Sequence, residues 1–284
     1  MTKKFTLGYS TCPNDTFIFH ALAHGLVAGG ALRFKSVLED VETLNQKART
    51  QTLDVTKLSF AAIGHLMETY GLLRSGAALG RGCGPLVVAR SGADLEHIGR
   101  SKVAVPGLWT TANLLLGLYV SPPPILISMP FDRIMPAVAG GDVDYGVIIH
   151  EGRFTFESYG LVDLLDLGQW WESQTGLPIP LGGIAIRREL GASIAEKVEM
   201  AIEESVRYAF DNPGASRDYV KANAQEMADV VIDRHIGLYV NDDSKTIGSE
   251  GVAAIEMLFK KARQAGMMPK SEKPLFAALS TKKR

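Results

Sequence analysis

Short apolar segments alternate with helical segments along the first two thirds of the chain, and the alternating segments form two successive series. The first series holds expected strands at residues 4–9, 32–38, 55–57 and 85–90, and the second at 102–105, 125–129, 145–149 and 181–187. Continuous apolar runs such as residues 147–149 are typical of parallel strands that are buried on both faces. From Ser193 onward only helical patterns remain. The sequence therefore predicts an α/β fold.

The restart of the pattern favours two lobes over one long sheet. Each lobe would hold one series, and the crossovers are expected near 90–94 and 186–189, where an apolar strand runs into a charged segment. We expect a large α/β lobe of residues 1–90 and 188–284, with the C-terminal helices packed on it, and a small α/β lobe of residues 91–187. Interfaces between domains are favoured places for small-molecule sites, so a ligand is expected in the cleft between the lobes.

Composition and charge exclude several classes of protein. Of the 284 residues, 46% are hydrophobic and 21% are charged, which is the balance of a globular protein. A formal net charge of -1 favours neither nucleic acid nor a membrane surface as a partner. Two cysteines make no disulfide framework. No stretch approaches the ~20 apolar residues of a membrane span, and the N-terminus lacks the apolar core of a signal peptide, so a cytoplasmic location is expected. The sequence does not indicate an oligomeric state.

The segment YGVIIHEG, residues 145–152, ends an apolar strand on His150. In open α/β sheets, ligands gather at the carboxyl ends of the strands. Histidine is also the side chain best suited to move a proton near neutral pH. His150 is therefore a candidate general base. The alternative is a histidine that only caps or hydrogen-bonds the end of the strand.

Two further strand ends followed by helix starts are candidate anion sites. Thr110 and Thr111 would lie at a helix N-terminus, where backbone N–H groups and the helix dipole attract an anion. One of them can instead be a simple N-cap. The run Lys57, Leu58 and Ser59 has the same geometry in the first series, with the charge of Lys57 facing the same cleft, although Ser59 can also be only an N-cap. Together these groups predict two sides of a cleft around an anionic ligand.

The loop after the first strand would shape the floor of this cleft through Ser10, Asn14 and Asp15. Asn14 and Asp15 are also suited to cap the next helix. Cys12 has no activating partner in the sequence, so an inert thiol is expected there. Trp170 and Trp171 lie in a loop-like stretch at 167–180, where they would cover the core or else line a pocket.

Motifs for cofactors are absent from the sequence. His20 and His24 are spaced i, i+4, but there is no HExxH pattern and no clear third ligand, so no metal site is expected. The glycines of GRGCG precede a strand and do not link a strand to a helix, so they make no dinucleotide fingerprint. There is no P-loop and no nucleophile elbow. Any chemistry is expected to use a base and oriented hydrogen bonds without a bound cofactor.

Taken together, these segments resemble the 1,4-dihydroxy-6-naphthoate synthase family of the futalosine route to menaquinone. The resemblance covers nearly the whole chain and includes GYSTCPNDTFIFHAL, TKLSFAA, VAVPGLWTTA and GVIIHEGRFTF. The family usually has Pro where this chain has Thr11, a change that leaves the candidate site residues intact. The resemblance implies the two-lobed α/β fold of type II periplasmic binding proteins, with a cleft between the lobes.

The resemblance also implies a carbon–carbon lyase that uses no metal or organic cofactor. Its substrate would be a small anionic aromatic molecule, cyclic dehypoxanthinylfutalosine, which is cleaved to 1,4-dihydroxy-6-naphthoate and dihydroxyacetone. The matching motifs imply His150 as the proton acceptor. They also imply substrate contacts on the two sides of the cleft, from Lys57, Leu58 and Ser59 and from Thr110 and Thr111.

Two other functions stay open. Chorismate dehydratase, of the same pathway, shares the binding-protein fold, but the GVIIHEGRFTF motif with its histidine favours the synthase. A solute-binding protein without catalysis would need export, and the expected lack of a signal sequence argues against it.

Overall fold

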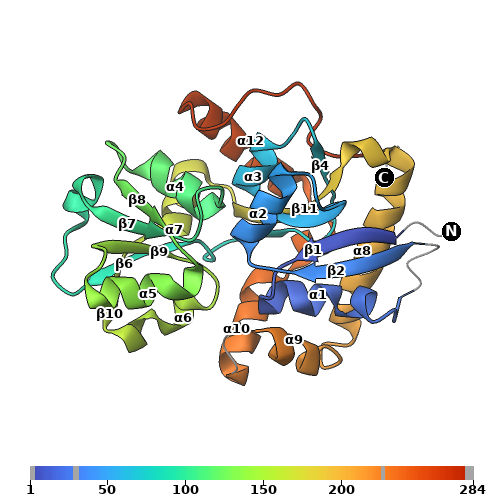
Figure 1. Ribbon diagram of the computed structural model, residues 1–284, viewed down its shortest axis with the longest axis horizontal. Coiled ribbons are helices and arrows are strands. Elements are labelled where there is room, and N and C mark those ends of the chain that lie inside the picture. The colour runs from blue at the N-terminus through green and yellow to red at the C-terminus, as the bar shows by residue number, and fades with distance from the viewer. Residues whose placement is uncertain (1–3, 28–31, 225–227, 279–284) are drawn as a thin grey trace.

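The computed structural model describes residues 4–27, 32–224 and 228–278. Within these ranges the strands form two separate sheets (Figure 1). One sheet has six strands, in the order β2-β1-β3-β11-β4 with β5 paired to β11, and the other has five, in the order β10-β6-β9-β7-β8. Each sheet is covered by helices, so the predicted α/β fold is confirmed and a single sheet through both series is excluded.

The six-stranded sheet forms the first lobe. Its strands are β1 (Lys4–Tyr9), β2 (Arg33–Leu38), β3 (Val55–Ser59), β4 (Tyr70–Leu72), β5 (Ala78–Gly80) and β11 (Ile179–Arg187). Strand β1 is parallel to β2 and β3, whereas β11 is antiparallel to β3, β4 and β5. Its helices are α1 (Pro13–Ala23), α2 (Val41–Arg49), α3 (Phe60–His65), η3 (Arg188–Leu190), α8 (Ala192–Asp211), α9 (Arg217–Asn223), α10 (Asp229–Tyr239), α11 (Asp242–Lys245) and α12 (Ser249–Gln264). The C-terminal helices thus pack on the first lobe, as the sequence predicts.

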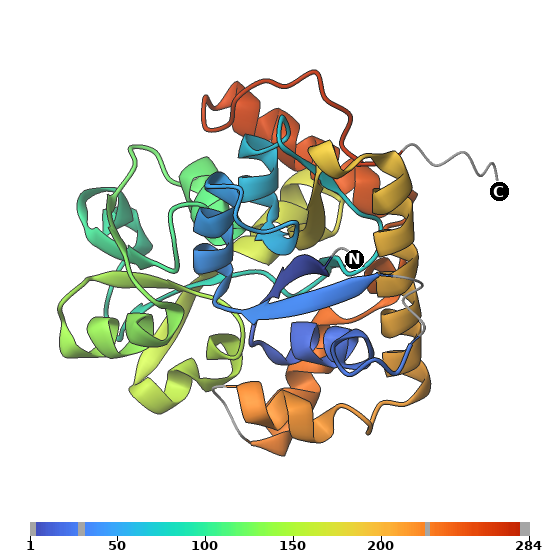
Figure 2. The same cartoon turned by 45° about the vertical axis from the view of Figure 1, so that its right-hand side comes forward.

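The five-stranded sheet forms the second lobe, which lies on the left in Figures 1 and 2. Its strands are β6 (Leu86–Arg90), β7 (Lys102–Val105), β8 (Ile125–Ser128), β9 (Tyr145–Ile148) and β10 (Leu161–Asp166). Strand β7 is parallel to β8 and β9, and β6 is antiparallel to β9 and β10. Its helices are η1 (Leu95–Arg100), α4 (Thr111–Tyr119), α5 (Phe131–Gly140), α6 (Gly152–Thr155), η2 (Phe156–Tyr159) and α7 (Leu167–Thr175). The carboxyl ends of β7 and β9 lead into loops that face the first lobe.

Strands β6 and β11 correct the lobe boundaries expected at 90/91 and 187/188. β6 pairs with β9 and β10 in the second lobe, and β11 pairs with β3 in the first. The chain therefore crosses between the lobes at 81–85 and at 176–178, through short segments rich in glycine and proline. It does not cross at the charged segments where the sequence predicts the crossovers. Gly84 fits its crossing because a Cβ there would come within 2.3 Å of Gly168 Cα. A side chain at this point would push the two segments apart.

One hydrophobic core cluster extends from one lobe into the other. It includes side chains of β3, β6, α4, α7 and α12, and Trp171 is buried within it. Trp171 Nε1 donates a hydrogen bond to the carbonyl oxygen of Pro178 at 3.0 Å. The stretch at 167–175 is thus a helix and not the expected loop, and Trp171 covers the core. Among the residues that the structure describes, no helix is both long and apolar enough to cross a membrane.

Candidate active site

A cavity lies between the two lobes and is lined by residues of both. It brings together all the site residues predicted from the sequence except one: Ser10, Asn14, Asp15, Lys57, Ser59, Thr110, Thr111 and His150. Leu58 is the exception.

His150 enters the cavity just beyond the end of β9. This strand ends at Ile148, and His150 has a φ of 57°, in the left-handed region that residues other than glycine rarely adopt. Its half-buried ring packs edge-on against Phe131, with ring centroids 5.1 Å apart, and stacks on His235 at 6.1 Å. The imidazole is held by these ring contacts, and it makes no hydrogen bond to another described residue. Its nitrogens are therefore available to a ligand.

Burial lowers the pKa of His150 to about 4. The negative charge of Asp15 opposes this shift, and the positive charge of Lys57 adds to it. The imidazole is thus unprotonated at neutral pH, the form in which it can accept a proton. The pKa lies well below the near-neutral value that the sequence suggests for such a base, because burial removes hydration that stabilises the imidazolium form.

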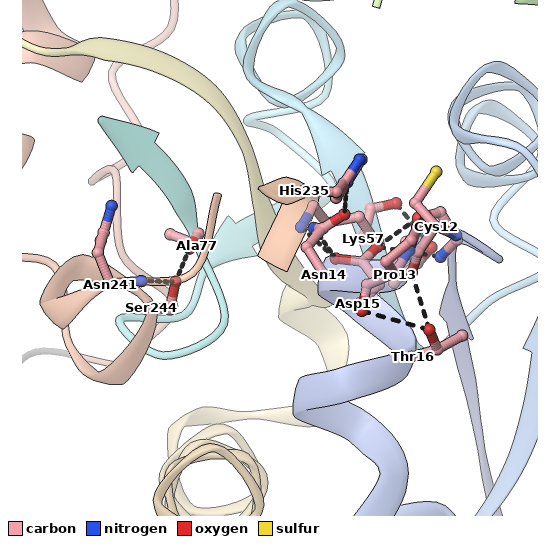
Figure 3. Close-up of polar contacts among 12 residues, drawn as sticks. Cys12, Pro13, Asn14, Asp15, Thr16, Lys57, Ala77, His235, Asn241 and Ser244 are labelled. Atoms are coloured by element: carbon pink, nitrogen blue, oxygen red, sulfur yellow. Dashed lines mark hydrogen bonds and ion pairs between the residues drawn. The ribbon is translucent and has the colours of Figure 1, made fainter. Parts of the chain in front are cut away.

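The first lobe contributes a closed polar network centred on Asp15, which is fully buried. Asp15 Oδ1 accepts hydrogen bonds from Lys57 Nζ at 2.6 Å and from Asn14 Nδ2 at 2.9 Å (Figure 3). Its Oδ2 accepts from the Ser10 N–H at 3.0 Å and from Ser10 Oγ at 2.8 Å. The charge of Lys57 is therefore paired with Asp15. Lys57 does not face the cavity as the free cation that the sequence suggests.

Leu58 belongs to the core and does not line the cavity. Successive side chains of a strand point to opposite faces, so Lys57 and Ser59 face the cavity while Leu58 faces away. The Leu58 side chain is fully buried in the hydrophobic cluster. The expectation that Leu58 lines the substrate therefore does not hold for its side chain, which the alternation of β3 turns away from the cavity.

Thr110 and Thr111 both use their hydroxyl groups within the protein. Thr110 caps α4, because its Oγ1 accepts a hydrogen bond from the Asn113 N–H at 3.2 Å. Thr111 Oγ1 donates to the carbonyl oxygen of Leu181 at 2.7 Å and accepts from the Ala61 N–H at 3.3 Å. Leu181 and Ala61 belong to the first lobe, so Thr111 joins the two lobes. The backbone N–H groups at the start of α4 are the donors that this turn can offer to an anion.

Asn45 of α2 is a buried site residue that no sequence motif indicates. Its Nδ2 donates to Ser59 Oγ and to the Trp109 carbonyl oxygen, both at 3.3 Å, and its Oδ1 accepts from the Ser59 N–H at 3.1 Å. Glu42, one turn earlier, accepts from the Trp109 N–H at 3.2 Å. Helix α2 thus connects the cavity wall of the first lobe to the loop that precedes α4 in the second.

The two cysteines are buried and do not act as nucleophiles here. Burial raises the pKa of Cys12 well above its usual value and raises that of Cys83 to about 12, so both thiols stay protonated. The rings of His20 and His24 lie 4.6 Å apart and pack against Tyr219. Among the described residues, no group of three or more His, Cys, Asp or Glu side chains is arranged to hold a metal ion.

Comparison with known proteins decides the family. Residues 5–264 match the menaquinone biosynthesis family. This chain is a member of that family. It is 49% identical over 270 residues to 1,4-dihydroxy-6-naphthoate synthase of Thermus thermophilus, a match that covers 95% of this chain and 98% of the relative. It is 48% identical over 268 residues to the synthase of Streptomyces coelicolor, covering 93% and 94%. The names of these relatives indicate an enzyme, and the resemblance stated from the sequence is confirmed.

Solved structures of other proteins, including binding proteins, have the same fold as this chain. A crystal structure of a protein from Archaeoglobus fulgidus is similar with a TM-score of 0.88 and 38% identity, covering 93% of this chain and 98% of that one. The alkanesulfonate-binding protein SsuA from Xanthomonas axonopodis pv. citri, bound to MOPS, has a TM-score of 0.69 at 13% identity, covering 94% of each chain. At that identity the likeness shows the fold alone. The predicted periplasmic-binding-protein-like fold is confirmed.

Proposed function

We propose that the protein is a 1,4-dihydroxy-6-naphthoate synthase that cleaves a carbon–carbon bond of cyclic dehypoxanthinylfutalosine. The observation that carries the proposal is an unprotonated His150 in a cavity between two lobes, in a chain 49% identical to a curated synthase. His150 removes a proton from the sugar-derived ring, and the bond to the three-carbon fragment breaks. Formation of the aromatic naphthalene ring drives this step. The proton on His150 is then available to the departing dihydroxyacetone.

The walls of the cavity suit an aromatic anion. Val41, Ile149 and Leu181 line it with apolar groups against which a fused ring can pack. Ser59 Oγ accepts from Asn45, so its own proton is available to the substrate. We assign the substrate carboxylate to the Ser59 hydroxyl and to the backbone N–H groups at the start of α4, where the helix dipole favours a negative charge.

In the proposed reaction, all atoms and electrons of the two products come from the substrate. Cleavage and aromatisation need no external oxidant or reductant, so His150 and oriented hydrogen bonds are sufficient, without a metal or an organic cofactor. The partner in this proposal is a small-molecule substrate, with no role for nucleic acid or a membrane surface. We place the reaction in the cytoplasm.

Incubation of the purified protein with cyclic dehypoxanthinylfutalosine tests the proposal. We expect naphthoate absorbance to appear together with dihydroxyacetone in equal amounts, and His150→Ala to abolish both. Turnover of chorismate, with no reaction of the futalosine derivative, would instead identify a dehydratase. Binding of the futalosine derivative without any product would identify a solute-binding protein.

A further inference from the structure

His235 is a buried histidine that the proposed reaction does not use. It lies on α10 of the first lobe, and its side chain has no exposed surface. Nε2 lies 3.0 Å from Asn14 Oδ1, and Nδ1 lies 4.0 Å from Glu151 Oε2. Its ring packs on Tyr239, with centroids 4.6 Å apart, and stacks on His150 across the boundary between the lobes at 6.1 Å, with an angle of 27° between the rings.

The network around Asp15 determines which nitrogen of His235 carries a hydrogen (Figure 3). Asp15 Oδ1 accepts from Lys57 and also faces the side-chain amide of Asn14 at 2.9 Å. A carboxylate paired with an ammonium group only accepts, so the NH₂ group of Asn14 must point to Asp15 and its oxygen must point to His235. An amide oxygen also only accepts. His235 Nε2 therefore carries the hydrogen and donates it to Asn14.

His235 is held in its neutral form. Burial lowers its pKa well below the usual value, and the neighbouring His150 and Lys57 lower it further. The hydrogen on Nε2 leaves a lone pair on Nδ1, which faces the Glu151 carboxyl group. A neutral ring can stack on His150 without the repulsion that two imidazolium groups would suffer.

We propose that His235 is a positioning residue that aligns the His150 imidazole and the Asn14 amide in the cavity. This inference rests on the proposed role of His150 as the base. His150 has a left-handed backbone and no hydrogen bond to another described side chain, so packing sets the direction of its ring: Phe131 from its own lobe and His235 from the other. His235 thus couples the orientation of the base to the meeting of the two lobes. The same residue fixes the amide of Asn14, which lines the cavity beside the base.

Three substitutions separate the two contacts of His235. His235→Phe keeps a ring against His150 but loses the donor to Asn14, His235→Gln keeps an N–H donor but loses the ring, and His235→Leu loses both. A displacement of about 1 Å at a reacting group can cost on the order of 10²-fold in rate, so we expect a loss of that order in kcat for His235→Leu. We expect KM and the affinity for the naphthoate product to change little. His235→Phe and His235→Gln should each recover part of the lost kcat.

A double-mutant cycle with Asn14→Ala measures how far His235 acts through Asn14. Residues that act as one unit give non-additive effects, so the double variant His235→Phe with Asn14→Ala, in which the donor to Asn14 is already lost, should lose less than the product of the single losses. His97→Leu, at an exposed histidine of η1, is the matched control and should keep the kcat of the unaltered protein.

The outcomes separate this inference from the proposed function. A His235→Leu protein with full kcat, while the unaltered protein is active and His150→Ala is not, overturns the positioning role alone. An inactive unaltered protein, or a fully active His150→Ala, overturns the proposed function. Where His235→Leu does not fold, His235→Phe and His235→Gln decide. Lower melting temperatures with an unchanged kcat per folded molecule in both would show that His235 only stabilises the fold.

Discussion

The two walls of the cavity hold their polar groups in different ways. On the wall of the first lobe, both oxygens of Asp15 accept hydrogen bonds and the ammonium group of Lys57 is paired with it. On the wall of the second lobe, His150 is held by ring packing and left without a hydrogen bond to another described residue. One wall is a closed network of charge-assisted bonds, and the other presents a group whose bonding capacity is unused.

This difference indicates that the two walls have different roles. A buried, satisfied network is costly to change and fixes geometry, but it has little capacity left for proton transfer. His150 has the opposite character, with unused nitrogens and a strained φ of 57° that costs on the order of 1–3 kcal/mol. Such strain is retained where the surrounding structure imposes it, often at functional sites. In the proposed reaction the closed network of the first lobe would thus fix the geometry of its wall, and the second lobe would supply the base.

The largest expected effect comes from removing the base. We expect His150→Asn to slow turnover by about 10²–10⁴-fold, because general-base catalysis contributes roughly that much and an amide cannot accept the proton. Asparagine tolerates the left-handed backbone, so the melting temperature should hardly change. Single-turnover rates and melting curves on the same preparation measure both quantities. A variant that is unstable yet fast once folded would mean that His150 is structural, and the contrast between the walls would disappear.

The second largest effect should come from the network of the first lobe. Asp15→Asn leaves the ammonium group of Lys57 buried without its counter-charge, and breaking such a pair costs about 3–5 kcal/mol of unfolding free energy. Urea unfolding measures this loss. The control is Asp242→Asn, which breaks an exposed pair with Lys245 and should change little. A loss at Asp15 as small as in the control would show that the network does not hold this wall.

Local patterns in the sequence predict the strands well but not the partners of each strand. The run at 86–90 is visible as a strand, yet its place in the second lobe depends on pairing with residues 145–148, which are distant in the sequence. The run at 179–187 likewise belongs to the first lobe because it pairs with β3. No local signal contains this information. The charge that follows each strand indicates only where the strand ends.

The candidate site shows the same limit. Strand ends that precede helices predict that His150 and Thr110 face one cavity, and both line it, because position along a strand is a local property. The side chain of Leu58 faces away from the cavity, because a strand sends neighbouring side chains to opposite faces and the motif alone does not show which of them face a ligand. Asn45 and His235 are buried behind the cavity wall, where they contact Ser59 and Asn14, and the sequences of their helices give no sign of this. Their role arises from tertiary packing alone.

A smaller effect is expected at Thr111, which joins the walls. Thr111→Val removes the hydrogen bond to the Leu181 carbonyl oxygen and should cost about 0.5–1.5 kcal/mol of unfolding free energy. Because the hydroxyl serves the protein, product affinity should hardly change. Thr111→Ser keeps the hydroxyl and is the control. If the hydroxyl instead binds the substrate carboxylate, the loss will appear in product affinity, at about 1.5–3 kcal/mol, and the free energy of unfolding will hardly change.

The smallest change is expected on acidification, and it tests whether the second wall excludes water as its burial indicates. An ordinary histidine with a pKa of 6.5 would be mostly protonated at pH 5, so kcat/KM would fall roughly 25-fold between pH 7 and pH 5. Burial lowers the pKa of His150 to about 4, so the reactive neutral form persists and kcat/KM should change little over that range. The loss should begin only as the pH approaches 4. Because kcat/KM reports the free enzyme, a fall centred near pH 6.5 would mean that His150 is hydrated like a surface histidine and that packing does not hold it apart from water.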